Sequence, residues 1–401
     1  MVTRVVILGG SFAGLTAAYD LKRKLKDRVR VTVVSRTDRF WFIPSLIWVP
    51  FGRRTAEDIS FPLRPALEAK GIVFRHETAT RILPERNVVV TERGELEYDY
   101  LLIATGPAYN FKLVKGLGPD GYTQSVCNVH EAEACGKAWQ EFLKDPGPIV
   151  IGGTQFASCF GAAYEVLFNV EHALRKAGVR ERVPSLTYVT SEPFLTHFGI
   201  GGMRGGEPMI KAFFRFRHLD AVTDATIREV AKDKVILEDG RELPFRFAII
   251  IPPFLGADVV RESGLGNEKG FVEVDECYRH VRHHNIFAAG VAAVVPSPPG
   301  RTKVPVGVPK TGYMSEVMAA YAAKNIIADV TGGRPKRKPF QRITPLCIMD
   351  CGDMEVLIAG SSMFPPRALS MLVPNPFGDW AKVLFEKYYL WRMRTGSTWL
   401  P

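Results

Sequence analysis

The sequence predicts an α/β protein, and two strand–turn–helix units carry this prediction. Near the N-terminus an apolar strand at 4–8 leads through a glycine turn at 9–14 into a helix at 15–24. A second strand, at 149–151, turns through two glycines and should continue as a helix from about Phe156. Aromatic residues at helical spacing close the chain. We therefore expect two Rossmann-like domains, the second inserted into the first, followed by a C-terminal membrane-facing segment.

The composition is that of a folded protein with an anionic partner. The chain has 401 residues, of which 46% are hydrophobic and 23% charged, which suits two or three globular domains. A net charge of +10 without a nucleic-acid motif favours an anionic membrane surface over nucleic acid. No signal peptide and no apolar run of spanning length are present, so we expect a peripheral membrane protein, assumed to lie on the cytoplasmic side. The six cysteines match neither a disulfide scaffold nor a zinc site.

The first glycine turn predicts a dinucleotide site at the start of a helix. Its pattern is G-x-S-x-x-G, in which a serine replaces the middle glycine and offers a hydroxyl to a phosphate. The second strand, at 29–34, ends in Ser35 and Arg36 where an acidic ribose ligand is usual. Either Ser35 holds the ribose or the turn is only structural. The cofactor contacts expected at this turn are Gly9, Ser11, Phe12, Ala13 and Gly14.

Two later segments should return to this site. One strand ends in Ala-Thr105-Gly106, and another runs over 286–290 into Gly290 and Val291. Three such turns at these positions are typical of flavoproteins with two dinucleotide-binding domains, so FAD is the expected cofactor. The predicted domains are 1–112 plus 275–330 for FAD, the inserted domain 113–274, and the C-terminal domain 331–401.

The second glycine turn is altered toward sulfur chemistry. Thr154 stands where a second glycine would let a pyrophosphate approach, and no acid closes the strand that ends at Ser191. Delivery of hydride by NADH is therefore disfavoured. Cys159 is expected in the first turns of the following helix, where the helix dipole would stabilise its thiolate.

With these features the sequence resembles the sulfide:quinone oxidoreductases over nearly its whole length. The most specific matches are the segments 157–165, 285–291, 308–316, 345–350 and 385–389. The resemblance implies that FAD carries electrons from sulfide to a membrane quinone and that polysulfide or sulfur is the product. It also implies a redox pair formed by Cys159 and Cys347, with Cys159 as the persulfide carrier. A third cysteine, Cys127, is linked in some members to the flavin or to sulfur release.

The remaining site residues also follow from the resemblance. Glu165 and His197 are candidate proton handlers, and each could instead be an ordinary structural residue. Where many members have a histidine four residues after the third cysteine, this chain has Glu131. Further FAD contacts would be Pro44, Ala79, Lys310, Thr311 and Gly312. The quinone would lie near Ile348, Phe385, Tyr388 and Tyr389.

Alternatives remain open for the function and for the last helix. The rival functions are a flavocytochrome c sulfide dehydrogenase, a type II NADH:quinone dehydrogenase, and a flavin-dependent sensor without turnover. In the last helix Trp380, Leu384, Tyr388 and Trp391 share one face, which suits the bilayer interface, the protein core or a second subunit in a homo-oligomer. Cys135, Cys277 and Cys351 are expected to be structural, and the histidines at 280, 283 and 284 to form an exposed turn without a metal.

Overall fold

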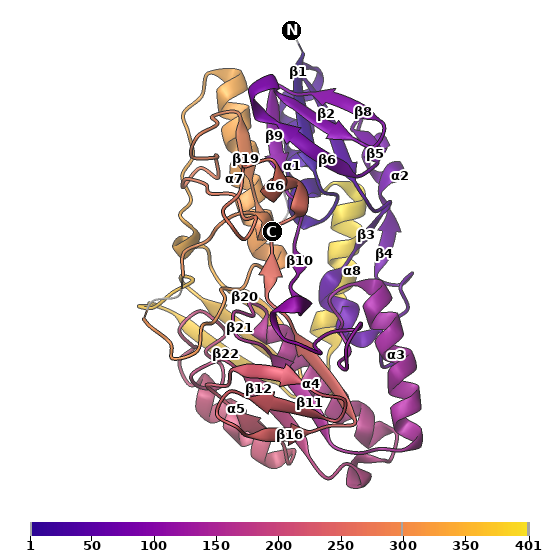
Figure 1. The fold of residues 1–401 in the computed structure, drawn as a ribbon. Helices are drawn as coiled ribbons and strands as arrows, with labels where there is room; N and C mark the ends of the chain where they lie inside the picture. The colour runs from indigo at the N-terminus through magenta and orange to yellow at the C-terminus, as the bar shows by residue number, and fades with distance from the viewer. Residues whose placement is uncertain (1, 298–299, 399–401) are drawn as a thin grey trace.

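The computed structural model describes residues 2–297 and 300–398, and the structural statements below concern these residues. Two parallel sheets that share no strand lie at opposite ends of the molecule, and α8 (Trp380–Thr395) lies between them (Figure 1). This α/β architecture with two Rossmann-like sheets confirms the predicted fold class. The domain boundaries stay predictions.

The first sheet has the strand order β19-β9-β1-β2-β5, and all its pairs are parallel. Its central strand is buried from Val5 to Leu8, because other elements cover the faces of the sheet. Helices α1 and α7 pack against each other beside it. The elements are β1 (Thr3–Leu8), α1 (Phe12–Leu25), β2 (Val29–Ser35), β5 (Val73–His76), β9 (Tyr100–Ile103), β19 (Ile286–Ala288) and α7 (Gly312–Thr331).

The second sheet has the order β13-β12-β11-β17, again parallel. The helix after its glycine turn begins at Phe160, not at about Phe156 as expected. Phe156 has a φ of 63°, and its N–H donates to the carbonyl of Pro305, so the chain makes an extra turn first. The elements are α3 (Val129–Lys144), β11 (Ile149–Gly153), α4 (Phe160–Lys176), β12 (Leu186–Thr190), α5 (Gly206–Phe216), β13 (Asp220–Val222) and β17 (Phe247–Ile251).

Antiparallel strands make up the rest of the fold. The three-stranded sheet β20-β21-β22 belongs to the C-terminal part and packs on α4. Hairpins turn at residues 93–94 and 239–240. The elements are β3 (Arg39–Trp41), β4 (Ser60–Pro62), α2 (Leu63–Glu68), β6 (Ala79–Leu83), β7 (Val88–Thr91), β8 (Gly94–Glu97), β10 (Ala108–Tyr109), β14 (Ile227–Val230), β15 (Lys234–Leu237), β16 (Glu242–Pro244), β18 (Phe254–Leu255), α6 (Asp258–Glu262), β20 (Leu346–Asp350), β21 (Glu355–Gly360) and β22 (Ser370–Asn375).

Helix α8 buries two of its cations and exposes two of its tryptophans. Trp380, Leu384 and Trp391 are 54%, 57% and 49% exposed, whereas Lys382 and Arg392 are buried. These two cations, which helical spacing would place beside or across from the aromatic face, instead point inward to buried carboxylates. Among the described helices none is long and apolar enough to cross a membrane.

The histidines that follow β18 differ from expectation in one respect. His280 is buried, not exposed, and its ring accepts the N–H groups of Arg282 and His283 while its Nε2 lies 3.2 Å from the carbonyl oxygen of Leu265. The ring therefore organises the turn. The described residues hold no group of side chains arranged to bind a metal ion.

Candidate active site

The first glycine turn is closed so tightly that only glycine fits at two positions. A Cβ on Gly9 would lie 2.1 Å from the carbonyl oxygen of Ala104, and one on Gly14 would lie 1.9 Å from that of Gly9. The turn before α1 and the turn after β9 are thus in direct contact. This leaves the first N–H groups of α1 accessible to an anionic group such as a pyrophosphate.

The start of α7 lies against the start of α1. A Cβ on Gly312 would lie 3.0 Å from the ring of Phe12, and one on Gly290 would lie 3.5 Å from the Cβ of Ala13. The structure therefore brings together the predicted cofactor segments 9–14, 105–106, 290–291 and 310–312.

Polar groups in these segments lack partners within the protein. The hydroxyls of Thr105 and Thr311 are buried without a hydrogen bond among the described residues. Ser11 and Thr311 precede α1 and α7, yet neither side chain caps its helix. A buried unpaired hydroxyl after β9 and another at the start of α7 fit a ligand with phosphate and heterocyclic acceptors, so the residues present suit FAD.

Lys310 is a buried amine at the same place. Its Nζ donates to the carbonyls of Val291, at 2.9 Å, and Ala293, at 2.7 Å. Burial lowers its pKa to about 7, so its charge is easily gained and lost near neutral pH.

The other predicted cofactor contacts lie around this centre. Ser35 is buried at the end of β2, and its Oγ lies 3.3 Å from a Cβ placed on Gly10. Arg36 is exposed, while Pro44 and Ala79 are partly exposed. The cofactor roles of these four residues stay predictions.

Cys159 directly precedes α4 as its N-cap residue and is partly buried. Burial raises the pKa of its thiol to about 11; the Ala162 N–H opposes the rise and Glu165 adds to it. The expected stabilisation of the thiolate by the helix start is thus outweighed by desolvation, and the resting thiol is neutral.

Cys347 lies on β20, which packs against α4. Burial raises the pKa of its thiol to about 12, the charge of Glu165 adds to the rise, and Lys382 opposes it. Cys159 also contributes to this shift, so the two thiols lie within electrostatic reach of each other. All six cysteines are described, and all are free thiols.

A buried polar network joins the elements that carry the two cysteines. Glu165 of α4 accepts the N–H of Asp350 at 2.8 Å and the ammonium of Lys382 at 2.5 Å. Asp350 in turn accepts from Asn169 at 3.0 Å and from Trp48 at 2.5 Å. Burial raises the pKa of Glu165, and its ion pair with Lys382 opposes that rise.

Sequence reasoning missed Lys382, Asp350, Asn169 and Trp48. Only the spacing of Lys382 and Glu386 on one helical turn hinted at an inward polar face. Burial lowers the pKa of Lys382, but Glu165 and Asp350 more than compensate, so the amine stays protonated.

Cys127 precedes α3 and lies beside a serine–glutamate pair. Ser125 donates to Glu131 at 2.5 Å and accepts the N–H of Cys127 at 3.1 Å. Burial raises the pKa of Cys127 to about 12, Ser125 opposes the rise, and Glu131 and Cys159 add to it. Glu131 therefore lies close enough to affect the Cys127 thiol, at the position where many sulfide:quinone oxidoreductases have a histidine.

His197 is buried in the loop between β12 and α5. Its ring packs edge-on against Phe194 at 5.2 Å, and its Nδ1 has no hydrogen-bond partner among the described residues. Burial lowers its pKa, so the imidazole is neutral at neutral pH.

The altered second turn is fixed to its own sheet. Thr154 is buried and donates its N–H to the carbonyl of Ile251 at 3.1 Å.

Glu192 is the strand-end acid that sequence reasoning did not find, one residue beyond Ser191. It is buried, and burial raises its pKa to about 7 although four donors oppose the rise. A carboxylate turned inward does not present itself to a ribose.

The predicted quinone residues of α8 meet the start of α1 in an aromatic cluster. The ring of Tyr389 lies 4.5 Å from that of Phe385, 5.7 Å from that of Phe42 and 6.0 Å from that of Phe12. Tyr388 and Ile348 are partly exposed. The cluster therefore connects the predicted cofactor segments with the outer surface near α8.

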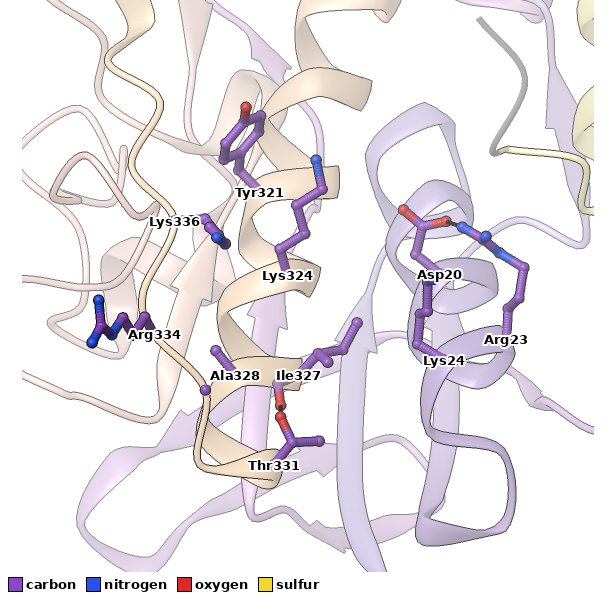
Figure 2. Close-up of a pocket in the computed structure, with 11 residues that line it drawn as sticks. Asp20, Arg23, Lys24, Tyr321, Lys324, Ile327, Ala328, Thr331, Arg334 and Lys336 are labelled. Atoms are coloured by element: carbon purple, nitrogen blue, oxygen red, sulfur yellow. Dashed lines mark hydrogen bonds and ion pairs between the residues drawn. The ribbon is translucent and has the colours of Figure 1, made fainter.

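A separate cavity lies between α1 and α7, away from these residues. It has a volume of about 460 Å³, and Figure 2 shows that basic side chains line it. Asp20, its one acidic lining residue, is paired with Arg23 at 2.6 Å. None of the predicted site residues lines it. Its basic residues are Arg23, Lys24, Lys324, Arg334 and Lys336.

Comparison with known proteins agrees with this geometry. Residues 3–323 match the family described as pyridine nucleotide-disulphide oxidoreductase. The sulfide-quinone reductase of Aquifex aeolicus is 37% identical over 406 aligned residues, covering 99% of this chain and 92% of that protein. The mitochondrial sulfide:quinone oxidoreductase of Dictyostelium discoideum is 26% identical over 309 residues, covering 74% of this chain and 66% of the relative.

Solved structures give the same result. The X-ray structure of the Aquifex aeolicus sulfide:quinone oxidoreductase superposes with a TM-score of 0.93 at 36% identity, covering 98% of this chain and 92% of that one. NDH2 from Plasmodium falciparum shares the fold, with a TM-score of 0.75 at 14% identity and coverage of 99% and 96%. FAD is the cofactor of these flavoproteins, and the glycine turns described above fit it. The chain therefore belongs to the pyridine nucleotide-disulphide oxidoreductase family and, within it, to the sulfide:quinone oxidoreductases.

Proposed function

We propose that this enzyme oxidises sulfide at the cysteine pair Cys159 and Cys347 and passes the electrons through FAD to a quinone. The observation that carries the proposal is the buried network around Glu165. It fastens α4, which follows Cys159, to β20, which bears Cys347. Together with the electrostatic effect of Cys159 on the pKa of Cys347, this link supports the pairing of the two thiols.

The sulfur step is a thiol–disulfide exchange. Hydrosulfide attacks one sulfur of a Cys159–Cys347 disulfide, the S–S bond breaks, and a persulfide forms on Cys159 while Cys347 leaves as a thiolate. Rejoining Cys159 and Cys347 through the added sulfur removes two electrons, for which bound FAD would be the acceptor. Each further hydrosulfide then lengthens the sulfur chain, which departs as polysulfide. Bound FAD supplies the two-electron acceptor for the sulfur and the two-electron donor for the quinone.

The surrounding residues manage charge during this step. Desolvation makes both thiolates costly, which favours bonds to sulfur over free thiolates. Lys382 offsets part of the cost at Cys347, and Glu165 holds Lys382 in place. Glu165 and His197 are the groups suited to carry protons to and from the sulfur.

The aromatic cluster of α8 supports a quinone site. Phe385, Tyr388, Tyr389 and Ile348 offer apolar and aromatic surface to a quinone ring. In this proposal polysulfide leaves near Cys159 and Cys347, and the electrons leave the flavin for a quinone beside α8.

The exposed face of α8 supports docking on a membrane. Trp380, Leu384 and Trp391 remain outside the core of this chain, so core packing no longer explains them. Apolar residues on and beside β20, β21 and β22 are also exposed. We propose that the surface, made of Leu346, Leu357, Leu369, Val373, Phe377, Trp380, Leu384 and Trp391, enters the bilayer interface where quinone is dissolved.

Rapid-mixing spectroscopy of the holoenzyme tests the function. Sulfide should bleach the flavin absorbance, NADH should not, and a soluble quinone should restore it. The variants Cys159→Ala and Cys347→Ala should each abolish the bleaching by sulfide, while Cys135→Ala, which removes a buried thiol of α3, should retain it. Rapid bleaching in either of the first two variants would contradict the proposed cysteine pair.

A further inference from the structure

The loop that carries His197 is strained on both sides of this residue. Thr196 has a φ of 69° and Phe198 a φ of 54°, although neither is glycine. A left-handed backbone is unfavourable for residues with a side chain, and the strain persists only where the surroundings hold the backbone in place. Something must therefore fix this loop.

Glu192 and Tyr164 hold both strained residues. The Oε1 atom of Glu192 accepts the N–H of Phe198 at 2.6 Å. The hydroxyl of Tyr164 accepts the N–H of Thr196 at 2.9 Å and donates to Oε2 of Glu192 at 3.1 Å. All of these groups are buried, so water does not compete for the bonds.

Two more hydroxyls complete the surroundings of this carboxylate. Thr190 donates to Oε2 at 3.0 Å and Tyr188 at 3.3 Å. The rings of Tyr164 and Tyr188 stack at 4.5 Å, which makes the pair a rigid support. Residues of β12 and α4 therefore fix the orientation of the Glu192 carboxylate. The carboxylate in turn fixes the backbone of the loop at Phe198.

The loop reaches the sulfur site through Gly307. A Cβ on Gly199 would lie 1.9 Å from the carbonyl oxygen of Gly307. The N–H of Gly307 donates to the carbonyl of Ala157 at 2.8 Å, two residues before Cys159. The loop of His197 and the turn of Cys159 thus flank the same glycine.

We propose that Glu192 is a positioning residue that, together with Tyr164, holds the imidazole of His197 at the sulfur site with its Nδ1 free. The catalytic part of this inference rests on the proposed oxidation of sulfide. The acid that ends the second strand in nicotinamide-binding domains is here used to fix a loop.

The test compares two buried tyrosines of the same cluster. Tyr164→Phe removes the hydroxyl that bonds both Glu192 and the loop. The control Tyr188→Phe keeps the stacked ring and removes a hydroxyl that makes no hydrogen bond to the described loop backbone and only the longest bond to Glu192, at 3.3 Å. Glu192→Gln removes the charge of the carboxylate. The measurement is the rate at which diethyl pyrocarbonate acylates His197 in the folded holoenzyme, read by peptide mass spectrometry.

Tyr164→Phe and Glu192→Gln should raise the acylation rate of His197 about ten-fold, because a released loop exposes the imidazole, and Tyr188→Phe should stay within about two-fold of wild type. The same two variants should slow flavin reduction by sulfide about ten-fold, again unlike the control. Wild-type acylation rates in both variants, or an equal rise in Tyr188→Phe, would overturn the inference.

These readouts separate the inference from the proposed function. If sulfide fails to reduce the wild-type flavin, the proposed function falls, while the acylation of His197 still decides whether Glu192 holds the loop. If Glu192→Gln does not fold, Tyr164→Phe decides alone, since it removes one hydroxyl and leaves the carboxylate intact.

Discussion

At the scale of single residues, burial and neighbouring charges decide how readily a side chain ionises, more than the position of the residue in its helix does. Cys159 stands at a helix start, yet burial makes its thiol harder to ionise. Lys382 lies on a helix that ends at the surface, yet it is buried beside Cys347 and Glu165. The catalytic behaviour of the cysteines therefore depends on side chains contributed by other segments.

Lys382→Met should slow the reduction of flavin by sulfide by at least about ten-fold, because a buried charge-assisted bond is worth about 1.5–3 kcal/mol and each 1.4 kcal/mol is a factor of ten. The cation beside the leaving thiolate of Cys347 is lost in this variant. Stopped-flow absorbance measures the rate. Lys387→Met is the matched control, since Lys387 is exposed on the same helix and should behave like wild type. A wild-type rate in Lys382→Met would rule out its role.

Glu316 should make the stability of the protein depend on pH. Burial raises its pKa to about 7, while Arg392 and Tyr389 oppose the rise. A carboxyl whose folded pKa exceeds its unfolded value contributes stability below the unfolded pKa, and this contribution disappears as pH rises through the folded pKa. The free energy of unfolding should therefore fall between pH 4.5 and 7 by up to about 3 kcal/mol.

Urea unfolding at several pH values measures this fall. Glu316→Gln should be less sensitive to pH over the same range, because its amide does not ionise. Glu133→Gln changes an exposed glutamate and should keep the wild-type dependence. Equal slopes in Glu316→Gln and wild type would contradict the assignment.

At the scale of elements, α8 performs two tasks with two faces. Its inner face provides Lys382, Tyr389 and Arg392 to the interior, and its outer face presents aromatic residues. This arrangement explains why the aromatic periodicity is visible in the sequence while the partners of its charges are not.

Replacing Trp380, Leu384 and Trp391 together with serine should weaken binding to anionic lipid vesicles at least about ten-fold, because the apolar area that enters the interface is lost. Vesicle co-sedimentation measures the binding. Phe216→Ser removes a side chain of α5 that is 83% exposed and should leave the binding unchanged. If the triple variant binds vesicles normally but changes its oligomeric size, the face is a subunit contact.

At the scale of the whole molecule, ion pairs fasten the C-terminal sheet to the second parallel sheet. Arg217, which follows α5, is buried; it pairs with Glu171 of α4 at 2.9 Å and with Asp353 in the turn between β20 and β21. It also donates to the carbonyl of Cys351 at 2.9 Å. These contacts, with those of Glu165, set the position of the hairpin that bears Cys347.

Arg217→Met should lower the free energy of unfolding by about 3 kcal/mol, because it removes the buried cation from Glu171 and leaves the carbonyl of Cys351 without this donor. Urea unfolding at neutral pH measures the loss. Arg241→Met breaks an exposed pair with Asp239 and should cost less than about 1 kcal/mol. Similar losses in the two variants would show that Arg217 is no more important than a surface ion pair.

The sequence by itself determined the order of the fold and the place of the cofactor segments. Glycine turns between an apolar strand and a helix are local signals, and Gly9 and Gly14 indeed stand where a Cβ would meet the backbone. The resemblance also named Cys159 and Cys347, whose pairing remains a prediction. Only the tertiary structure decided that Lys382 faces inward, that His280 is buried and that Glu192 holds a loop. Burial and the partners of a charge depend on segments far apart in the chain, and no local pattern records them.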